Sequence, residues 1–235
     1  MISDPGMRVF LTYVLLGMPA LGIASYFRVR SGKPLPPKLQ RYRAVIVLQV
    51  FLVALTVAVA KKNLVELFGS IRPSGSAWLL AAAYLAVIAV GLNRGWRKLS
   101  EERKQRARVL LPEDSVQWRF WIFISILAGL SEEMAFRGLA YVAVSQQTGS
   151  SALAVLICTA AFGIAHMLQG WRGVLGTSLI ALIFHAIVFL TSGLYLAIGI
   201  HIAYDLIVGY IAARVLGKGS KQLAAPAQAG PEGSL

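Results

Sequence analysis

Charged residues are scarce in this chain, and cysteine is almost absent. Of its 235 residues, 14% are charged and 57% are hydrophobic, whereas soluble domains contain about 25% charged and about 45–50% apolar residues. Cys158 is the only cysteine, which excludes an intramolecular disulfide and any CxxC metal or redox motif. The sequence also lacks an HExxH zinc motif and zinc-finger spacing. This composition excludes a soluble enzyme and favours a single membrane domain.

Long apolar segments make up most of the sequence. Because a membrane-spanning helix needs about 20 mostly apolar residues, we predict an all-α polytopic transmembrane helical bundle with about seven spans. The spans lie at 7–27, 44–60, 76–93, 119–141, 151–168, 174–190 and 194–214. Residues 1–216 form the single membrane domain in this interpretation. The mixed-charge segment 99–117 is predicted to be an interfacial amphipathic helix, and the Gly-, Ala- and Pro-rich tail 217–235 to be disordered.

The net charge of +13 comes mainly from two connectors between apolar segments. The first connector holds Arg28, Arg30, Lys33, Lys38, Arg41 and Arg43, and the second holds Arg94, Arg97, Lys98, Arg103, Lys104, Arg106 and Arg108. Cytoplasmic loops of membrane proteins carry such an excess of Lys and Arg, and they attract anionic lipid head groups. The pattern predicts an N-out, C-in topology with a retained first helix. This distribution of basic residues favours the lipid bilayer as a partner and disfavours nucleic acid.

Ionisable residues inside the predicted spans gather in the last four of them. The first three spans contain almost none, whereas the last four contain Glu132, Glu133, Arg137, His166, His185, His201 and Asp205, including every histidine of the protein. An ionisable side chain inside a membrane is costly and is usually functional or paired. The distribution therefore predicts a polar site built by the C-terminal half of the chain.

Helical spacing indicates which of the acidic groups meets the arginine. Glu133 and Arg137 are four residues apart, so they lie on one helix face and are expected to form an ion pair. Glu132 is rotated by about 100° from Glu133 and is less able to share that arginine. An acid without a partner in its own helix must find one elsewhere or become protonated. Glu132 is therefore the carboxylate most in need of another explanation.

The three histidines differ in the possible partners that lie within their own predicted helices. His201 and Asp205 are four residues apart, which lets the carboxylate orient or charge the imidazole. Phe162 precedes His166 by four residues and is expected to lie beside it, as a packing residue. His185 has no obvious partner in its own span, and we expect it to pack or to form a structural hydrogen bond.

These groups are compatible with three kinds of chemistry. One is hydrolysis, with Glu132 as general base on a water molecule and histidines polarising a carbonyl. A second places the water on a metal ion held by His and Glu or Asp ligands. The third is proton relay in a transporter. Position in the sequence does not separate them, although the lack of ionisable groups in the first three spans disfavours a proton-coupled transporter.

Three short motifs resemble those of a known family. Residues 132–137 read EEMAFR (EExxxR), residues 162–166 read FGIAH (FxxxH) and residues 201–205 read HIAYD (HxxxN/D). In this order, on successive C-terminal spans, they resemble the CPBP family of intramembrane proteases. That family includes the CAAX prenyl endopeptidases and the Abi proteins linked to bacteriocin processing and immunity. The resemblance covers about 119–214, and the first three spans match only as apolar helices.

The resemblance implies a role for each residue of the motifs. Glu132 would be the base that activates water, with His166 holding that water alongside it. Glu133 and Arg137 would form the pair that fixes the helix, in agreement with their spacing. His201 would donate a hydrogen bond toward the developing oxyanion. Counting about 1.5 Å per residue along the spans places His166 nearer the cytoplasmic end than Glu132 and His201.

Asp205 departs from the family pattern, because many members carry asparagine at this position. An asparagine amide can donate to an oxyanion, whereas an ionised carboxylate can only accept. Asp205 is therefore expected to orient His201, to stay protonated in a dry site, or to help hold a metal. Glu132, His166 and His201 would supply the three ligands that catalytic zinc requires. We expect a glutamate-type mechanism without a cofactor, with zinc as the alternative.

The sequence thus predicts an intramembrane endopeptidase in the bacterial plasma membrane, with 119–214 as its catalytic half. Its substrate would be a membrane-anchored protein or a peptide precursor. The alternative is a non-catalytic immunity or binding factor with the same fold. Retention of Glu132 and His166 argues against that alternative, because a degenerate member would be expected to lose them first.

Overall fold

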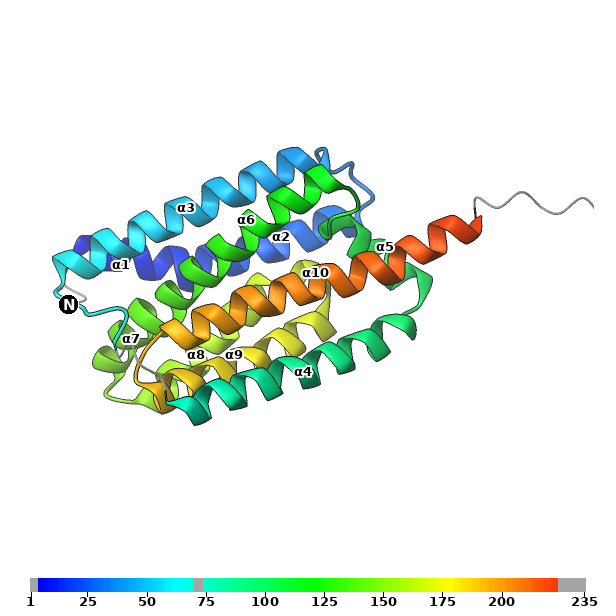
Figure 1. Cartoon of the computed structure of the whole chain (residues 1–235). Coiled ribbons are helices and arrows are strands. Elements are labelled where there is room, and N and C mark those ends of the chain that lie inside the picture. The colour runs from blue at the N-terminus through cyan, green and yellow to red at the C-terminus, as the bar shows by residue number, and fades with distance from the viewer. Residues whose placement is uncertain (1–3, 70–73, 224–235) are drawn as a thin grey trace, which may run out of the picture.

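The computed structural model describes residues 4–69 and 74–223, and over these residues the protein is helical (Figure 1). The first long helix consists of α1 (Pro5–Thr12), a π-helical turn η1 (Tyr13–Gly17) and α2 (Met18–Arg30). It is followed by α3 (Lys38–Lys62), α4 (Gly75–Arg97) and the short α5 (Glu101–Leu110). The second half contains α6 (Ser115–Glu132), the π-helical η2 (Glu133–Ala140), α7 (Tyr141–Thr148), α8 (Ser151–Ala165), the 3₁₀ turn η3 (Met167–Gln169), α9 (Trp171–Thr191) and α10 (Tyr195–Leu223).

The long helices run lengthwise in two rows (Figure 1). Helices α3, α6, α10 and α4 pack against one another in that order, and α2, α8 and α9 form the row behind them. A cluster of buried apolar residues from both rows joins them, with Phe10, Leu52, Phe136 and Phe162 among its members. Helix α6 therefore lies between the N-terminal helix α3 and the C-terminal helix α10.

Five helices of the described part of the chain are long and apolar enough to cross a membrane: Pro5–Arg30, Lys38–Lys62, Gly75–Arg97, Trp171–Thr191 and Tyr195–Arg214. Each coincides with a predicted span. The outward faces of these helices are apolar, as on α4, where Leu79 and Val87 are 73% and 71% exposed. Exposed apolar surface of this extent marks contact with something other than water.

The other two predicted spans take different forms. The predicted span 119–141 lies within the continuous helix α6–η2–α7, whose middle carries the acidic pair and the arginine. The predicted span 151–168 is shorter than expected, because the apolar α8 has 15 residues and ends at Ala165. The chain then makes a 3₁₀ turn to Gly170, which has a φ of +82°.

Two connecting segments can be compared with their predictions. The segment 99–117 contains α5, then a break that includes Pro112, then the start of α6 at Ser115. The predicted disordered tail, 217–235, begins inside a helix, because α10 continues to Leu223. Residues 224–235 lie outside the described part of the chain.

Two close helix contacts set the position of the polar residues. Gly129 of α6 lies against α10, where an added Cβ would be 3.2 Å from the backbone nitrogen of Ile202. Gly22 of α2 lies against the end of α8, where an added Cβ would be 2.3 Å from the carbonyl oxygen of Ala165. The first contact brings the acidic pair beside His201, and the second fixes the chain just before His166.

Candidate active site

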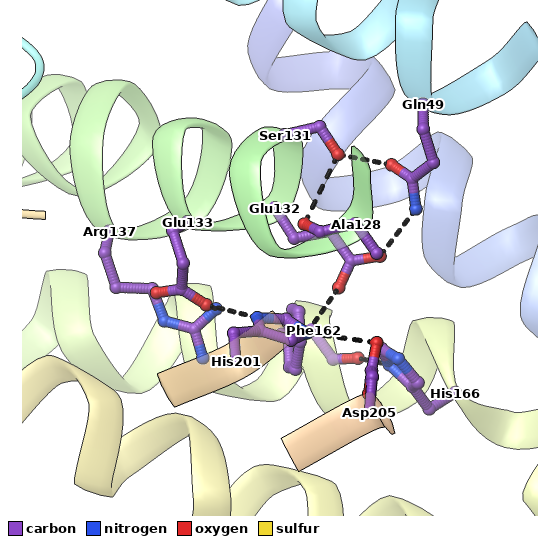
Figure 2. Close-up of polar contacts among 10 residues, drawn as sticks. All are labelled: Gln49, Ala128, Ser131, Glu132, Glu133, Arg137, Phe162, His166, His201 and Asp205. Carbon is purple, nitrogen blue, oxygen red and sulfur yellow. Dashed lines mark hydrogen bonds and ion pairs between the residues drawn. The ribbon is translucent and has the colours of Figure 1, made fainter. Parts of the chain in front are cut away.

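The acidic pair and His201 meet where α6 passes into η2. Glu132 is the last residue of α6 and Glu133 the first of the π-helical segment, and both are buried, as is His201 on α10. A π-helical segment inside an α-helix is rare and often lies at a functional site. Figure 2 shows the carboxylates of Glu132 and Glu133 directed toward the His201 imidazole.

Glu133 has two partners on different helices. Its Oε1 accepts a hydrogen bond from Nδ1 of His201 at 2.7 Å and lies 3.2 Å from Nη1 of Arg137. The guanidinium of Arg137 also lies over the ring of Phe162, 4.3 Å from the ring centroid, which is a cation–π contact. The expected Glu133–Arg137 pair is present, and Glu133 additionally fixes the orientation of His201.

Glu132 finds its partner in the N-terminal half of the chain. Its Oε1 accepts a hydrogen bond from Nε2 of Gln49 on α3 at 2.8 Å, and Oγ of Ser131 donates to Oε1 of Gln49 at 2.5 Å (Figure 2). Gln49 and Ser131 are both buried. The ionisable groups of the site come from the C-terminal half, as predicted, but α3 adds one buried polar group that the sequence analysis did not single out.

The second ring nitrogen of His201 faces two more carboxylates. Its Nε2 lies 3.8 Å from Oε2 of Glu132 and 3.9 Å from Oδ2 of Asp205, which is too long for a hydrogen bond. Helix α10 is held against α6 at this level by Nε1 of Trp121, which donates to the backbone carbonyl of Asp205 at 3.1 Å. It is Glu133 rather than Asp205 that makes the orienting hydrogen bond to His201.

His166 caps the end of α8. Its Nδ1 lies 2.8 Å from the carbonyl oxygen of Phe162, and the two rings are 4.7 Å apart, as the spacing predicts. The ring of Phe162 also lies 6.4 Å from that of His201. Among the described residues, no hydrogen bond or ion pair joins His166 to Glu132 directly.

A cavity of about 770 Å³ adjoins His201, whereas the acidic pair Glu132 and Glu133 does not line it. His166, His201 and Asp205 contribute to its wall, together with apolar side chains such as Trp96 and Trp121. Its walls come from α4, α5, α6, α8, α9 and α10. Gln169, Arg172 and Tyr204 also line the cavity, so its wall combines apolar side chains with several polar groups besides the two histidines and Asp205.

The proposed zinc ligands are not assembled as a set. Among the described residues, no group of three or more His, Cys, Asp or Glu side chains is placed to hold a metal ion. Glu132 and His201 face one another, but His166 does not complete a triad with them. His185, the third histidine, is buried beside Tyr141, with a ring separation of 5.8 Å.

A comparison with protein families gives a match to the second half of the chain. Residues 114–207 match the family described as type II CAAX prenyl endopeptidase, Rce1-like. This segment is a CPBP family domain. Neither curated proteins nor solved structures give a match to the chain. With its apolar membrane-spanning helices, the protein is an integral membrane protein.

The CPBP domain contains every site residue that the sequence suggested. Gln49 lies outside it, on α3. The sequence did carry a signal for Gln49, since it and Thr56 are the two polar residues of the predicted span 44–60, and polar residues in membranes are usually functional or paired. Family motifs gave no reason to single it out.

Proposed function

We propose that the protein is an intramembrane endopeptidase that hydrolyses a peptide bond of a membrane-anchored protein or peptide precursor. The observation that carries this proposal is the convergence of Glu132 and Glu133 on His201, which itself lines a cavity. The match to the CPBP family supports the same activity. His201 lies on the cavity wall and faces both buried carboxylates, so it would connect a peptide held in the cavity with Glu132.

In the proposed reaction, Glu132 is the general base. It takes a proton from a water molecule, and the resulting hydroxide attacks the carbonyl carbon of the scissile bond. The tetrahedral intermediate then collapses, and Glu132 returns the proton to the leaving nitrogen. His166, on the wall of the same cavity, holds the attacking water in this scheme.

His201 stabilises the oxyanion in this scheme. Nδ1 carries the proton that Glu133 accepts, so Nε2 is the atom available to the substrate. To donate to the oxyanion, Nε2 must also carry a proton, which is the imidazolium form of the ring. Hydrogen-bond donors fixed in advance around a developing charge usually supply the largest part of catalysis.

The orientation in the membrane is part of the proposal. We place the N-terminus outside and the C-terminus inside a bacterial plasma membrane, with seven segments crossing it. The excess of basic residues in the connectors after α2 and α4 supports this arrangement. Helices α8 and α6–η2–α7 cross in addition to the five longer apolar helices.

The test is a comparison of protein termini in membranes from cells that carry the wild-type protein or the Glu132→Gln variant. Glutamine keeps the shape of the side chain but cannot take a proton from water. We expect a set of new chain ends that are present with the wild-type protein and lost with the variant. Those chain ends would identify the substrate and its cleavage site.

The matched control is Glu66→Gln, because Glu66 is an exposed glutamate outside the site. This variant should give the same chain ends as the wild-type protein. Identical termini in all three membranes, with Glu132→Gln present at the wild-type level, would contradict the protease proposal.

A further inference from the structure

The amide of Gln49 is held in one orientation by its two neighbours. Its Nε2 faces Oε1 of Glu132 at 2.8 Å, and its Oε1 faces Oγ of Ser131 at 2.5 Å. An ionised carboxylate only accepts hydrogen bonds, so the NH₂ group of the amide must point toward Glu132. The amide oxygen then receives the hydroxyl proton of Ser131. Exchange of the amide oxygen and nitrogen would place two acceptors against each other.

The three residues form a chain of hydrogen bonds within the bundle. Ser131 is fully buried, Gln49 is 9% exposed and Glu132 is 7% exposed. Each buried polar group in the chain has a partner, which is the condition under which such a network rigidifies a site. A hydrogen bond from an amide to a carboxylate is also stronger than one between neutral groups.

We propose that Gln49, held by Ser131, is a positioning residue that fixes the carboxylate of Glu132 and stabilises its ionised form. The proposal rests on the function proposed above, because it gives Glu132 the role of general base. With Oε1 bound to Gln49, the free oxygen Oε2 is the one that faces Nε2 of His201. The N-terminal half of the chain thereby determines which oxygen of the base is available.

The other charged groups around Glu132 come from two elements besides its own helix. They are Glu133 and Arg137 on η2 and His201 and Asp205 on α10, while His166, just after α8, lines the cavity that His201 also lines. From α3, by contrast, the group that reaches Glu132 is neutral. Replacement of Gln49 therefore removes a hydrogen-bond donor without changing the charge of the site.

The first test uses the pH dependence of cleavage by the full-length protein in membranes, on the substrate found by the comparison of termini. We expect Gln49→Met, which keeps the length of the side chain, to move the acidic limb of the kcat/KM profile to higher pH. The shift should be about one pH unit, which corresponds to a tenfold change in an equilibrium constant. Ser131→Ala should move it in the same direction by less.

The matched control is Thr56→Val. Thr56 is a fully buried polar residue on the same helix, but its hydroxyl bonds only to the carbonyl of Leu52. This variant should leave the acidic limb in place. A purely structural role for Gln49 would lower the amount of folded protein and would not move the limb either.

A second test does not depend on proteolysis. Dicyclohexylcarbodiimide is an apolar reagent that adds to protonated carboxyl groups, and mass spectrometry locates the adduct. Labelling of Glu132 in membranes at a series of pH values gives the pH at which half of it reacts. We expect this pH to be higher by about one unit in Gln49→Met than in the wild-type protein and in Thr56→Val.

The two tests distinguish a failure of the protease function from a failure of the role proposed for Gln49. Unchanged cleavage by Glu132→Gln would overturn the protease function, and a labelling shift in Gln49→Met would still support the positioning of Glu132 by Gln49. Labelling and pH profiles of Gln49→Met that coincide with those of Thr56→Val would overturn the role of Gln49, whether or not the protein is a protease. If Gln49→Met does not fold, the same comparison is made with Ser131→Ala.

Discussion

Glu133 and His201 lie 68 residues apart in the chain and share a hydrogen bond of 2.7 Å between Oε1 and Nδ1. The same carboxylate oxygen pairs with Arg137. Glu133 therefore links the rigid pair of its own helix to the imidazole of α10. The residue expected only to stabilise the helix also determines which nitrogen of His201 faces Glu132 and Asp205.

Loss of the charge at position 133 should be costly. Glu133 and Arg137 are both almost fully buried, and removal of one partner of a buried ion pair typically costs about 3–5 kcal/mol. We expect Glu133→Gln to lower the free energy of unfolding by this amount. The buried Cys158 is the only thiol, so a thiol-reactive fluorophore reports unfolding in detergent.

The control for this prediction is Glu113→Gln. Glu113 forms an ion pair with Lys38 at 2.6 Å, but its side chain is 49% exposed. Solvent screens the half-exposed Glu113 carboxylate, although Lys38 is only 14% exposed, so this variant should lose about 1 kcal/mol or less. Equal losses in the two variants would argue that burial of the Glu133–Arg137 pair has no special weight.

Replacement of Asp205 by asparagine should increase cleavage. The Asp205 carboxylate lies 3.9 Å from Nε2 of His201 and can only accept a hydrogen bond when ionised. An asparagine amide would add a donor to the oxyanion, and one such donor is worth up to about 10²-fold in kcat. We expect Asp205→Asn to raise kcat and Asp205→Leu to lower it. A fall in both variants would assign the carboxylate itself a necessary role.

The contact between α6 and α10 should not tolerate even a methyl group. A Cβ at Gly129 would lie 3.2 Å from the nitrogen of Ile202 and 3.3 Å from the carbonyl oxygen of Ile198. Overpacking of this kind costs about 1–3 kcal/mol. We expect Gly129→Ala to lower both the unfolding temperature and the rate of cleavage, because Glu132 and Glu133 would move relative to His201.

Gly91 provides the opposite case. An added Cβ there meets no atom within 4 Å, and alanine is favoured over glycine in a helix by about 1 kcal/mol. Gly91→Ala should therefore unfold at a higher temperature than the wild-type protein. A stabilising effect of Gly129→Ala would show that the two helices can move apart without cost.

The proposed orientation can be tested with single cysteines in a Cys158→Ala background. Ser31 and Glu66 are exposed and lie in successive connectors. With the N-terminus outside, a membrane-impermeant maleimide added to intact cells should label Glu66→Cys and leave Ser31→Cys unlabelled. Permeabilised cells should label both. The reverse pattern in intact cells would require an N-in topology.

Local spacing predicted the contacts that depend on a single helix. The pairs Glu133–Arg137 and Phe162–His166 are present because residues four apart share a helix face. The five longest apolar segments were also recognisable, since length and composition alone identify them. Contacts between helices could not be predicted in this way, because they depend on packing that one sequence does not reveal.

Gln49 and His166 illustrate what sequence could not supply. Gln49 reaches Glu132 across 83 residues of chain, and no local pattern connects them. His166 was expected inside a longer span, but α8 ends at Ala165 and the histidine caps it. The roles of Glu132, His166, His201 and Asp205 in catalysis stay predictions until cleavage is measured.

The two faces of helix α4 affect how the concentration of a substrate should be expressed. Its inner face contributes to the cavity wall, and its outer face carries large exposed apolar side chains. If the proposed substrate is anchored in the same bilayer, it would reach the protein by lateral diffusion, and the relevant concentration would be its mole fraction among the lipids. Added lipid dilutes such an enzyme and its substrate as surely as added water dilutes a soluble pair.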